Sequence, residues 1–325
     1  MQQYFNHLIN KIIKKYKIVS ILIAISGGQD SICLIQLFES FINSYKDRIK
    51  KLEYIYIDHQ WRIDSKQHIE HLINYFTNIK KRVHIYQIFS NTFSENISRR
   101  NRYHIIINHA KIYRYEAILT AHTQTDKIET FILNLTRGSS IEGITSLNLH
   151  KKFNYHLNIF RPLINKNRKD INFFCKKWLL PIWLDVTNCN QNIKRNRIRN
   201  EIMPYLNKYF NYKLSYQLAK FLKTCYYDNE YIKQKTTKLY VSIKSYHYIS
   251  INIFMLKKEH LSIQIRIIQL FIYHNFCFIL NEKNLLKIIH YINRINHNYK
   301  STNIKWKNIN LYFSKKWLYV MLKKN

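Results

Sequence analysis

The first half of the chain alternates short apolar runs with longer segments in which apolar residues recur every three or four positions. The short runs predict strands at 18–25, 52–57, 83–88 and 117–120. The periodic segments predict helices at 31–44, 65–76, 101–113 and 126–136. Repeated strand–helix units of this kind build a doubly wound parallel sheet with helices on its faces. We therefore predict an α/β fold.

The pattern changes after about residue 150. A helix is predicted at 168–178, and the basic stretch IKRNRIRNEIMPYL follows at 193–206. Residues 215–325 mix helical stripes with strand-like runs rich in Tyr and Ile. Neither an internal repeat nor a linker rich in Gly or Pro separates these parts. We predict a domain at 1–206 and a smaller helical or mixed region at 207–325, with a soft boundary between them.

The chain is strongly basic. Lys and Arg number 53 against 19 acidic residues, a formal net charge of +34. A field of this size attracts polyanions, and RNA or DNA is the natural partner. The richness in Ile, Lys, Asn and Tyr is also typical of an AT-rich genome, so codon bias explains part of the Lys excess. A plastid-encoded protein with this bias would act in the stroma, and a bacterial one in the cytoplasm.

Cysteine usage and hydropathy exclude several classes of protein. The five cysteines, at positions 33, 175, 189, 225 and 277, form no CxxC pair and no zinc spacing with His. We expect reduced, packed thiols in an intracellular compartment. The first 17 residues lack the apolar core of a signal peptide, and the apolar stretch from Ile267 is too short and too polar to span a bilayer. We expect a soluble protein without a membrane partner and leave its oligomeric state open.

Two of the four glycines in the chain follow the first predicted strand, in the sequence SGGQDS at 26–31. Paired glycines between a strand and a helix let a phosphate approach backbone N–H groups at the positive end of the helix. Ser26 and Ser31 add hydroxyl donors, and Mg²⁺ between Asp30 and phosphate would remove their repulsion. The alternative is an ordinary glycine turn in which Asp30 and Ser31 cap the helix. The scarcity of glycine elsewhere favours phosphate binding.

These six residues resemble the SGGxDS loop of the PP-loop, or N-type, ATP pyrophosphatases. Six further segments narrow the resemblance: YIDHQWRIDS at 56–65, SRRNRY at 98–103, LTAHTQTDKIETFILNLTRGSSIEGITSL at 119–147, RPLI at 161–164, DVTN at 185–188 and RNRIR at 195–199. In this order, over about residues 18–206, they resemble the tRNA(Ile)-lysidine synthetase family. The resemblance implies a PP-loop catalytic domain at 1–206 and an accessory, tRNA-binding region at 207–325.

The resemblance also implies a reaction, a ligation that uses ATP and Mg²⁺. The oxygen on carbon 2 of the wobble cytidine in a CAU-anticodon tRNA(Ile) attacks the α-phosphate of ATP, and pyrophosphate leaves. The ε-amine of free L-lysine then displaces AMP and forms lysidine, which changes the codon read from AUG to AUA and the amino-acid identity from Met to Ile. The first step needs charge neutralisation and a positioned oxygen, so its catalysis is largely electrostatic and geometric.

Residue roles follow from the same resemblance. The predicted ATP-binding residues are Ser26, Gly27, Gly28, Gln29, Asp30 and Ser31. Asp30 and Asp126 are the predicted catalytic carboxylates, because both would lie at carboxyl ends of strands and could hold Mg²⁺ or the lysine ammonium. Glu129, one helical turn after Asp126, is predicted to share that role, and His122 and His59 are candidates for the same site. The alternatives are a helix N-cap for Asp126 and simple packing for the two histidines.

Six arginines are predicted to contact tRNA: Arg99, Arg102, Arg137, Arg195, Arg197 and Arg199. The alternative for the first two, in SRRNRY, is a surface helix face. Arg137 before Gly138 is equally well explained as the last-turn residue of a helix that ends in glycine. The arginines at 195–199 lie too close together for one helix face to solvate well, which favours an RNA backbone contact over a solvated charge run.

Some positions depart from the family pattern. Thr123 and Thr125 stand where a second His and an Asp are usual, and Ser98 stands in place of an Ala. Two other functions stay open. A tRNA thiolase of the same superfamily would carry paired cysteines or an iron–sulfur cluster, and the chain has no CxxC. A non-catalytic RNA-binding relic of the fold would be expected to lose the loop at 26–31 first.

Overall fold

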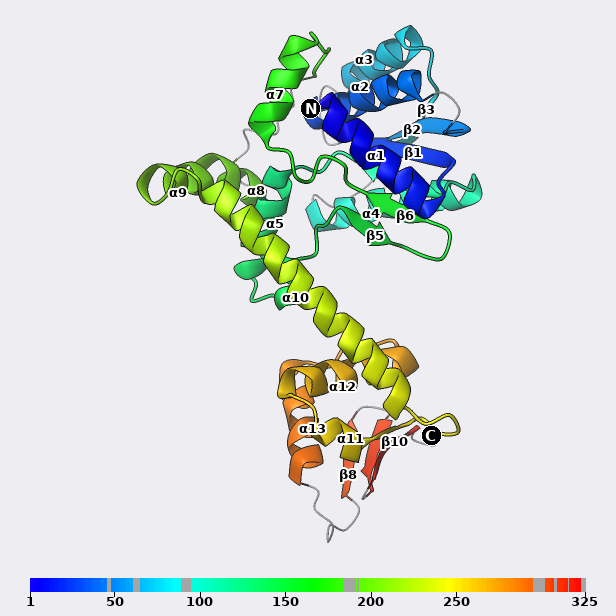
Figure 1. The fold of residues 1–325 in the computed structure, drawn as a ribbon, viewed down its shortest axis with the longest axis vertical. Coiled ribbons are helices and arrows are strands. Elements are labelled where there is room, and N and C mark those ends of the chain that lie inside the picture. The colour runs from blue at the N-terminus through cyan, green and yellow to red at the C-terminus, as the bar shows by residue number, and fades with distance from the viewer. Residues whose placement is uncertain are drawn as a thin grey trace. The chain divides into compact units, whose positions relative to one another are not determined.

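The computed structural model describes residues 1–45, 48–60, 65–88, 95–183, 191, 193–294, 302–306, 309–314 and 316–322. The chain divides into two compact units, Met1–Lys223 and Thr224–Asn325. Their elements are labelled in Figure 1. The DVTN motif at 185–188 and the central part of YIDHQWRIDS, at 61–64, lie outside the described residues.

The first unit is built on a six-stranded sheet with strand order β3-β2-β1-β4-β6-β5. Its strands are β1 Ser20–Ile25, β2 Lys51–Asp58, β3 Val83–Gln87, β4 Ala117–Thr120, β5 His150–Lys152 and β6 Asn158–Phe160. All neighbours are parallel except β5 and β6. β1 is buried on both faces, with Leu22 and Ile23 wholly inaccessible, which is why its sequence is continuously apolar. The predicted α/β class and its four parallel strands are confirmed.

Helices cover both faces of this sheet. On one face lie α1 Gln2–Tyr16, α2 Gln29–Ser44, α3 Ser65–Asn78 and α7 Arg168–Lys177. Phe5, Phe38, Phe76 and Phe174, one from each of these helices, share a single apolar core with the sheet. On the other face α4 Glu95–Ile112 packs Ile106 onto β2 and β4 residues. This two-sided cover lets the loops at the strand ends form a site.

A smaller core joins α5 Gln124–Leu135 to the basic stretch. That stretch forms α8 Lys194–Arg197, the π-helical turn η2 Ile198–Ile202 and α9 Met203–Tyr209, and the short helix α6 Ile141–Ile144 follows α5. Ile128 and Leu133 pack against Ile198 and Met203. The contact holds the basic stretch against the helix that carries Asp126.

The second unit contains a four-stranded antiparallel sheet of order β7-β10-β9-β8. Helix α10, Leu214–Ile243, begins in the first unit and ends in the second. The other elements of the second unit are β7 Ser250–Asn252, α11 Ile253–Lys257, α12 Leu261–Phe276, α13 Glu282–Arg294, β8 Thr302–Trp306, β9 Ile309–Phe313 and β10 Trp317–Leu322. Isoleucines of α12 and α13 dominate its core. The C-terminal region is thus helical and mixed, as predicted. Within the described residues, every helix falls short of the length and apolarity that crossing a bilayer requires.

Candidate functional site

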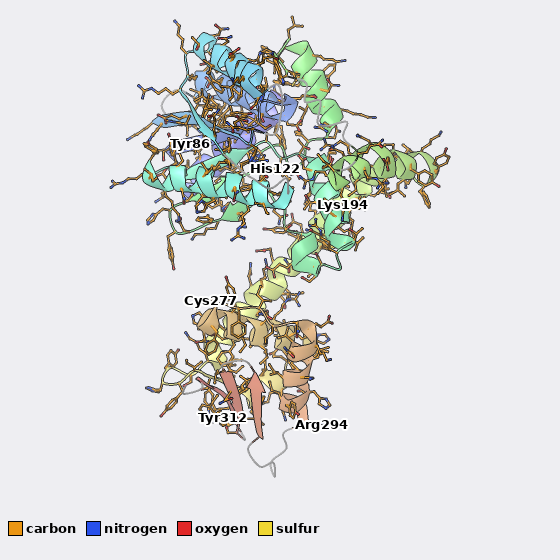
Figure 2. All side chains as sticks on the ribbon, turned by 180° about the vertical axis from the view of Figure 1, so that it is seen from behind. Tyr86, His122, Lys194, Cys277, Arg294 and Tyr312 are labelled. Carbon is orange, nitrogen blue, oxygen red and sulfur yellow. The ribbon has the colours of Figure 1, made fainter. Side chains whose placement is uncertain are left out.

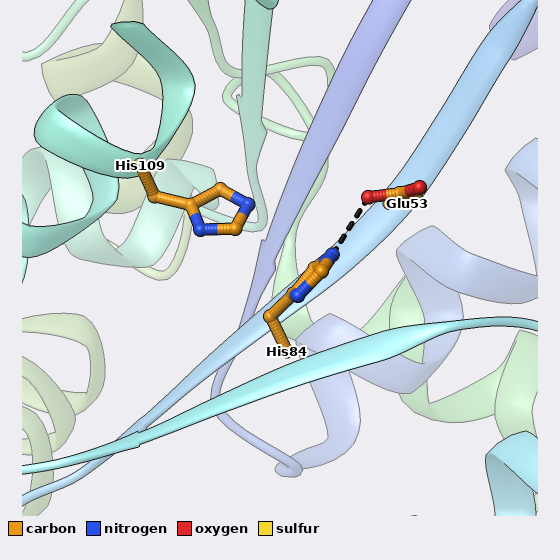
Figure 3. A group of neighbouring side chains, drawn as sticks. All are labelled: Glu53, His84 and His109. Carbon is orange, nitrogen blue, oxygen red and sulfur yellow. Dashed lines mark hydrogen bonds and ion pairs between the residues drawn. The ribbon is translucent and has the colours of Figure 1, made fainter. Parts of the chain in front are cut away.

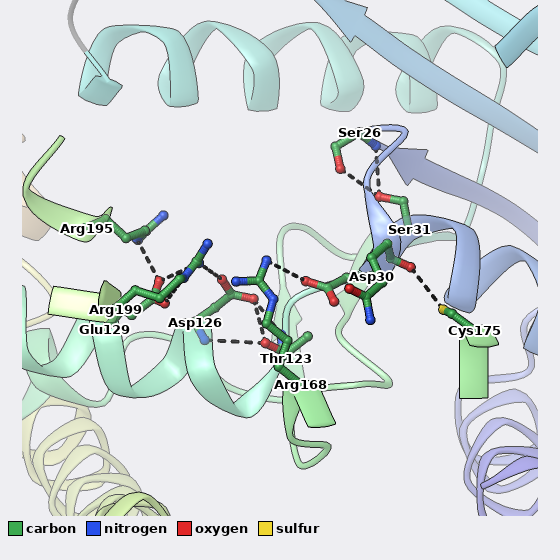
Figure 4. A network of polar contacts seen from close by, with 11 residues as sticks. Ser26, Asp30, Ser31, Thr123, Asp126, Glu129, Arg168, Cys175, Arg195 and Arg199 are labelled. Atoms are coloured by element: carbon green, nitrogen blue, oxygen red, sulfur yellow. Dashed lines mark hydrogen bonds and ion pairs between the residues drawn. The ribbon is translucent and has the colours of Figure 1, made fainter. Parts of the chain in front are cut away.

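The loop between β1 and α2 is held in shape by two serines. The backbone N–H of Ser26 donates to Ser31 Oγ at 2.9 Å, and the two hydroxyls lie 2.8 Å apart (Figure 4). Gly28 is the N-cap of α2 and offers no side chain to cap it. The positive end of α2 is therefore available to an anion.

Gly27 is required by both conformation and space. Its φ is +74°, in the left-handed region that other residues rarely adopt. A Cβ there would lie 2.0 Å from Nε2 of His68, a buried ring whose Nδ1 lies 3.0 Å from the Tyr56 hydroxyl. Gly28 differs, because a Cβ there would come no closer than 3.8 Å to Ser26 Oγ. Packing would therefore tolerate a side chain at Gly28. A glycine at this position is instead explained if a ligand approaches the backbone closely.

Asp30 lies at the start of α2 beside a distant cation. Its Oδ2 is 3.7 Å from Nη2 of Arg168, and its Oδ1 is buried with no hydrogen-bond partner among the described residues. Burial raises the pKa of Asp30 to about 6; Arg168 and Arg199 oppose this and Asp126 adds to it. An unpartnered buried carboxylate oxygen fits a bound cation such as Mg²⁺.

Asp126 lies at the start of α5 in a capping box. Its Oδ2 accepts from the backbone N–H of Thr123 at 2.8 Å and from the Thr123 hydroxyl at 3.0 Å. Burial would raise its pKa, but His122, the Thr123 hydrogen bonds and Arg199 together lower it. The N-cap is Thr123, so the alternative of Asp126 as N-cap is wrong; Asp126 completes the box from the third helical position.

The sheet brings these two carboxylates to the same edge. β1 and β4 are hydrogen-bonded neighbours, and the chain leaves β1 toward β2 on one side and β4 toward β6 on the other. Ligands bind at such a switch point in parallel α/β sheets. Asp126 lies close enough to Asp30 for its charge to raise the pKa of Asp30.

Glu129 anchors the basic stretch. It is fully buried, and its two oxygens accept from Arg199 Nε at 2.7 Å and Arg199 Nη2 at 3.0 Å. Arg195 Nε lies 3.5 Å from the same carboxylate. Burial raises the pKa of Glu129 against the opposing effect of these arginines. In the structure Glu129 therefore positions two arginines rather than reaching toward a cation or an ammonium group.

The remaining predicted tRNA residues differ in exposure. Arg197 points outward and pairs with Glu201 at 3.3 Å, both side chains largely exposed. Arg137 is also exposed, and Gly138 after it ends the turn with φ +69°. Figure 2 labels Lys194, the first residue of α8, the helix that carries Arg197. Arg197 and Arg137 are the two predicted arginines most open to a large polyanion.

Two histidines and two arginines line the inner part of the site. Arg102 Nε lies 3.3 Å from His59 Nε2, and burial with Arg102 beside it lowers the pKa of His59 to about 4. His122 Nδ1 lies 2.9 Å from the Thr120 hydroxyl. Burial lowers the pKa of His122 to about 3, with Arg99 among the cations that reinforce this. Both imidazoles are neutral at neutral pH, so they can contact a nucleotide without adding charge to the site.

Two further arginines belong to this region although the sequence reasoning did not select them. Arg168 approaches Asp30, and Arg161 is buried with Nη1 donating to the Asn148 carbonyl at 2.9 Å. The Nε of Arg161 is buried, with no hydrogen-bond partner among the described residues. Arg161 opens the RPLI motif, which was a usable signal; Arg168 merely opens a predicted helix. The edge of the sheet is thus rich in guanidinium groups, the chemistry that neutralises a polyphosphate.

Comparison with known families supports this assignment of the fold. A family model described as a PP-loop domain matches residues 1–206. This domain binds ATP. Among solved structures, a tRNA thiolase from Methanococcus maripaludis aligns with a TM-score of 0.52 at 14% identity, covering 63% of this chain and 72% of that one. At this identity the likeness concerns the fold alone.

Two curated relatives match over most of their length. A chloroplastic tRNA(Ile)-lysidine synthase of Gracilaria tenuistipitata var. liui is 43% identical over 98% of both chains. A second, from Pyropia yezoensis, is 33% identical over 93% of this chain and 89% of its own.

Proposed function

The chain belongs to the tRNA(Ile)-lysidine synthase family, and from this premise we infer that it joins lysine to the wobble cytidine of a tRNA. The acceptor is tRNA(Ile) with a CAU anticodon and the donor is free L-lysine. The product, lysidine, changes the codon read from AUG to AUA and the tRNA identity from Met to Ile. The site makes a carbon–nitrogen bond by way of an adenylated cytidine.

The observation that carries this function is the meeting of the loop at 26–31, which contains Asp30, with Asp126 at the switch point of the sheet. The phosphates would bind at the uncapped N-terminus of α2. The cytidine oxygen would lie beside them, at the edge of the sheet that arginines line. Asp30, with its unpartnered Oδ1, would hold Mg²⁺. Bound there, Mg²⁺ supplies charge neutralisation on the phosphates.

The first step depends on preorganised charge. Arg199 and Arg195 are fixed by Glu129, so they lose little entropy when negative charge develops on the departing pyrophosphate. The Ser26–Ser31 pair fixes the loop that would receive the phosphates. Gly28 leaves room for them against the backbone.

The second step needs a place for the lysine ammonium before it loses its proton. Asp126 is the candidate, because its lowered pKa keeps it ionised at neutral pH. Its Oδ1 lies 3.7 Å from Arg199 Nη2, too far for a hydrogen bond, so this oxygen can accept from an ammonium group. Glu129 contributes indirectly, by holding the arginines. Neutral His122 and His59 would contact nucleotide or cytosine.

The tRNA contacts divide between exposed and inner arginines. Arg137 and Arg197 are open to the RNA backbone, whereas Arg99, Arg102, Arg195 and Arg199 would meet the anticodon nucleotides near the site. We assign tRNA binding also to the accessory region 207–325, on the strength of its basic and tyrosine-rich composition. The two relatives described above are chloroplastic, which supports a plastid origin and, on our proposal, action in the stroma.

A tRNA thiolase is the nearest alternative, and the cysteines do not favour it. The four free cysteines described are Cys33, Cys175, Cys225 and Cys277, and among described residues no three of them gather at metal-binding spacing. The test omits lysine and measures pyrophosphate release from ATP. We expect release with the CAU tRNA and none with the wobble base changed to U. Release with the wobble U tRNA would support a thiolase, and tRNA binding without release would support a non-catalytic relic.

A further inference from the structure

A second cluster of functional side chains lies on β2, β3 and α4 (Figure 3). Glu53, His84 and His109 each offer one ligand atom, and these atoms all lie within 4.8 Å of one another. No other three His, Cys, Asp or Glu side chains in the described part of the chain meet at this spacing. Two imidazoles and a carboxylate are a ligand set that suits zinc and related borderline cations.

The cluster is separate from the nucleotide site. Glu53 lies five residues before Asp58, the last residue of β2, which ends at the edge where the nucleotide loop lies. At about 3.3 Å per residue, this places Glu53 roughly 16 Å back along the strand. A ligand here would therefore be independent of ATP, and the inference does not rest on the proposed function.

His109 has a nitrogen that no described residue satisfies. Its ring is 2% exposed, Nδ1 lies 2.8 Å from the Tyr86 hydroxyl, and Nε2 is buried without a hydrogen-bond partner. Figure 3 shows a ring nitrogen turned toward Glu53 and His84. An Nδ1–H that donates to Tyr86 leaves a lone pair on Nε2, the tautomer in which histidine binds metals. A buried nitrogen left without a partner destabilises the folded protein, so a ligand is expected there.

Glu53 is held as an acceptor beside it. His84 Nε2 lies 2.6 Å from Glu53 Oε2, and the Tyr115 hydroxyl donates to the same oxygen. These two contacts fix the orientation of the carboxylate, with Oε2 turned toward His84.

We propose that Glu53, His84 and His109 bind one divalent cation of the zinc type, with water completing its coordination. A zinc ion shared by a carboxylate oxygen and an imidazole nitrogen separates the two by about 3.3 Å, so the His84–Glu53 pair must open by less than about 1 Å. Lys51 opposes the cation, but its ammonium is held 3.2 Å from the Tyr113 carbonyl and 4.2 Å above the Tyr115 ring. The ion would link β2, β3 and α4 and so stabilise the first unit.

Zinc titration of the full-length, chelator-treated protein tests the site, with calorimetry for affinity and a thermal melt for stability. The wild type is expected to bind one equivalent that raises the melting temperature. Glu53→Gln and His109→Gln should each weaken that binding by at least about tenfold and abolish the shift. His156→Gln and Cys277→Ser, at exposed positions, control for adventitious binding and should keep it.

Circular dichroism without zinc shows whether each variant folds. If His109→Gln does not fold, Glu53→Gln, at a partly exposed position, still tests the site. Co²⁺ provides a second readout, because its visible spectrum reports nitrogen and oxygen ligands directly. Equal zinc affinity in the wild type and Glu53→Gln would overturn the proposal. So would a wild type without a thermal shift, which would mean that a water molecule satisfies His109.

Discussion

At the scale of single residues, the site sets two carboxylates apart by their surroundings. Asp30 is buried with one unpartnered oxygen, and its pKa rises to about 6. Asp126 accepts two hydrogen bonds from Thr123, and its pKa falls. The sequence suggested both residues from motifs, yet it could not distinguish them, because the difference arises from partners that only the fold brings close.

Replacement of Asp30 by Asn should separate stability from function. The folded protein holds the Asp30 proton more tightly than the unfolded chain, so this group's stability contribution is full below pH 3.8 and is lost as pH rises through about 6. Without Mg²⁺, Asp30→Asn should raise the free energy of unfolding at pH 8 by about 1–3 kcal/mol, and by roughly half as much at pH 5. It should also abolish pyrophosphate release.

Urea unfolding at the two pH values measures this effect. Asp228→Asn, at an exposed position in α10, is the matched control and should change little at either pH. A destabilised Asp30→Asn at pH 8 would mean that Arg168 compensates the buried charge fully.

The two loop glycines should respond differently to alanine. Gly27→Ala places a Cβ against His68 at an unfavourable φ, so it should destabilise the protein by about 2 kcal/mol or more. Gly28→Ala meets no close atom and should leave the melting temperature nearly unchanged while weakening ATP binding. Thermal melts and nucleotide titration distinguish the two effects. Unimpaired ATP binding by Gly28→Ala would argue against phosphate approach to this backbone.

At the scale of elements, the sequence predicted the four parallel strands and most helices of the first unit, because their apolar periodicity is strong. The three-residue strands β5 and β6 are too short for periodicity to identify. Helix α1 was not predicted, although Phe5, Ile9 and Ile12 recur in it at helical spacing. The sequence shows that three arginines lie close together at 195–199, but it does not show which of them are buried. Arg195 and Arg199 turn inward to Glu129, and Arg197 turns out to solvent.

The buried pair that joins α5 to η2 should matter far more than the exposed pair beside it. Glu129→Gln leaves Arg199 without its bidentate partner and should lower the free energy of unfolding by about 3–5 kcal/mol. Glu201→Gln breaks only the exposed contact with Arg197 and should cost less than about 0.5 kcal/mol. Denaturant unfolding compares them. Equal costs would show that Glu129 does not anchor the basic stretch.

At the scale of the whole molecule, charge is the property that reaches across both compact units. The composition alone pointed to a polyanion, and the family membership gives that polyanion as tRNA. How each residue contributes could not be derived from composition, since exposure decides it. The structure leaves Arg137 and Arg197 exposed and draws Arg195 and Arg199 inward.

Binding of tRNA should accordingly depend steeply on salt. A protein with a net charge of +34 releases counterions when it binds RNA, so affinity should fall at least about tenfold between roughly 50 and 200 mM salt. Arg197→Ala should reduce the slope of log affinity against log salt by up to about one unit. Filter binding over a salt series measures both. A slope unchanged by Arg197→Ala would exclude this arginine from the RNA contact.

The most direct test of the account is transfer of radiolabelled lysine to tRNA(Ile) with a CAU anticodon, in the presence of ATP and Mg²⁺. We expect label to enter the tRNA with the wild type, and none to enter with Asp30→Ala or when the wobble cytidine is replaced by U. Label that persists in Asp30→Ala would contradict the role of the carboxylate. A wild type that binds this tRNA and ATP without transferring lysine would contradict the proposed reaction itself.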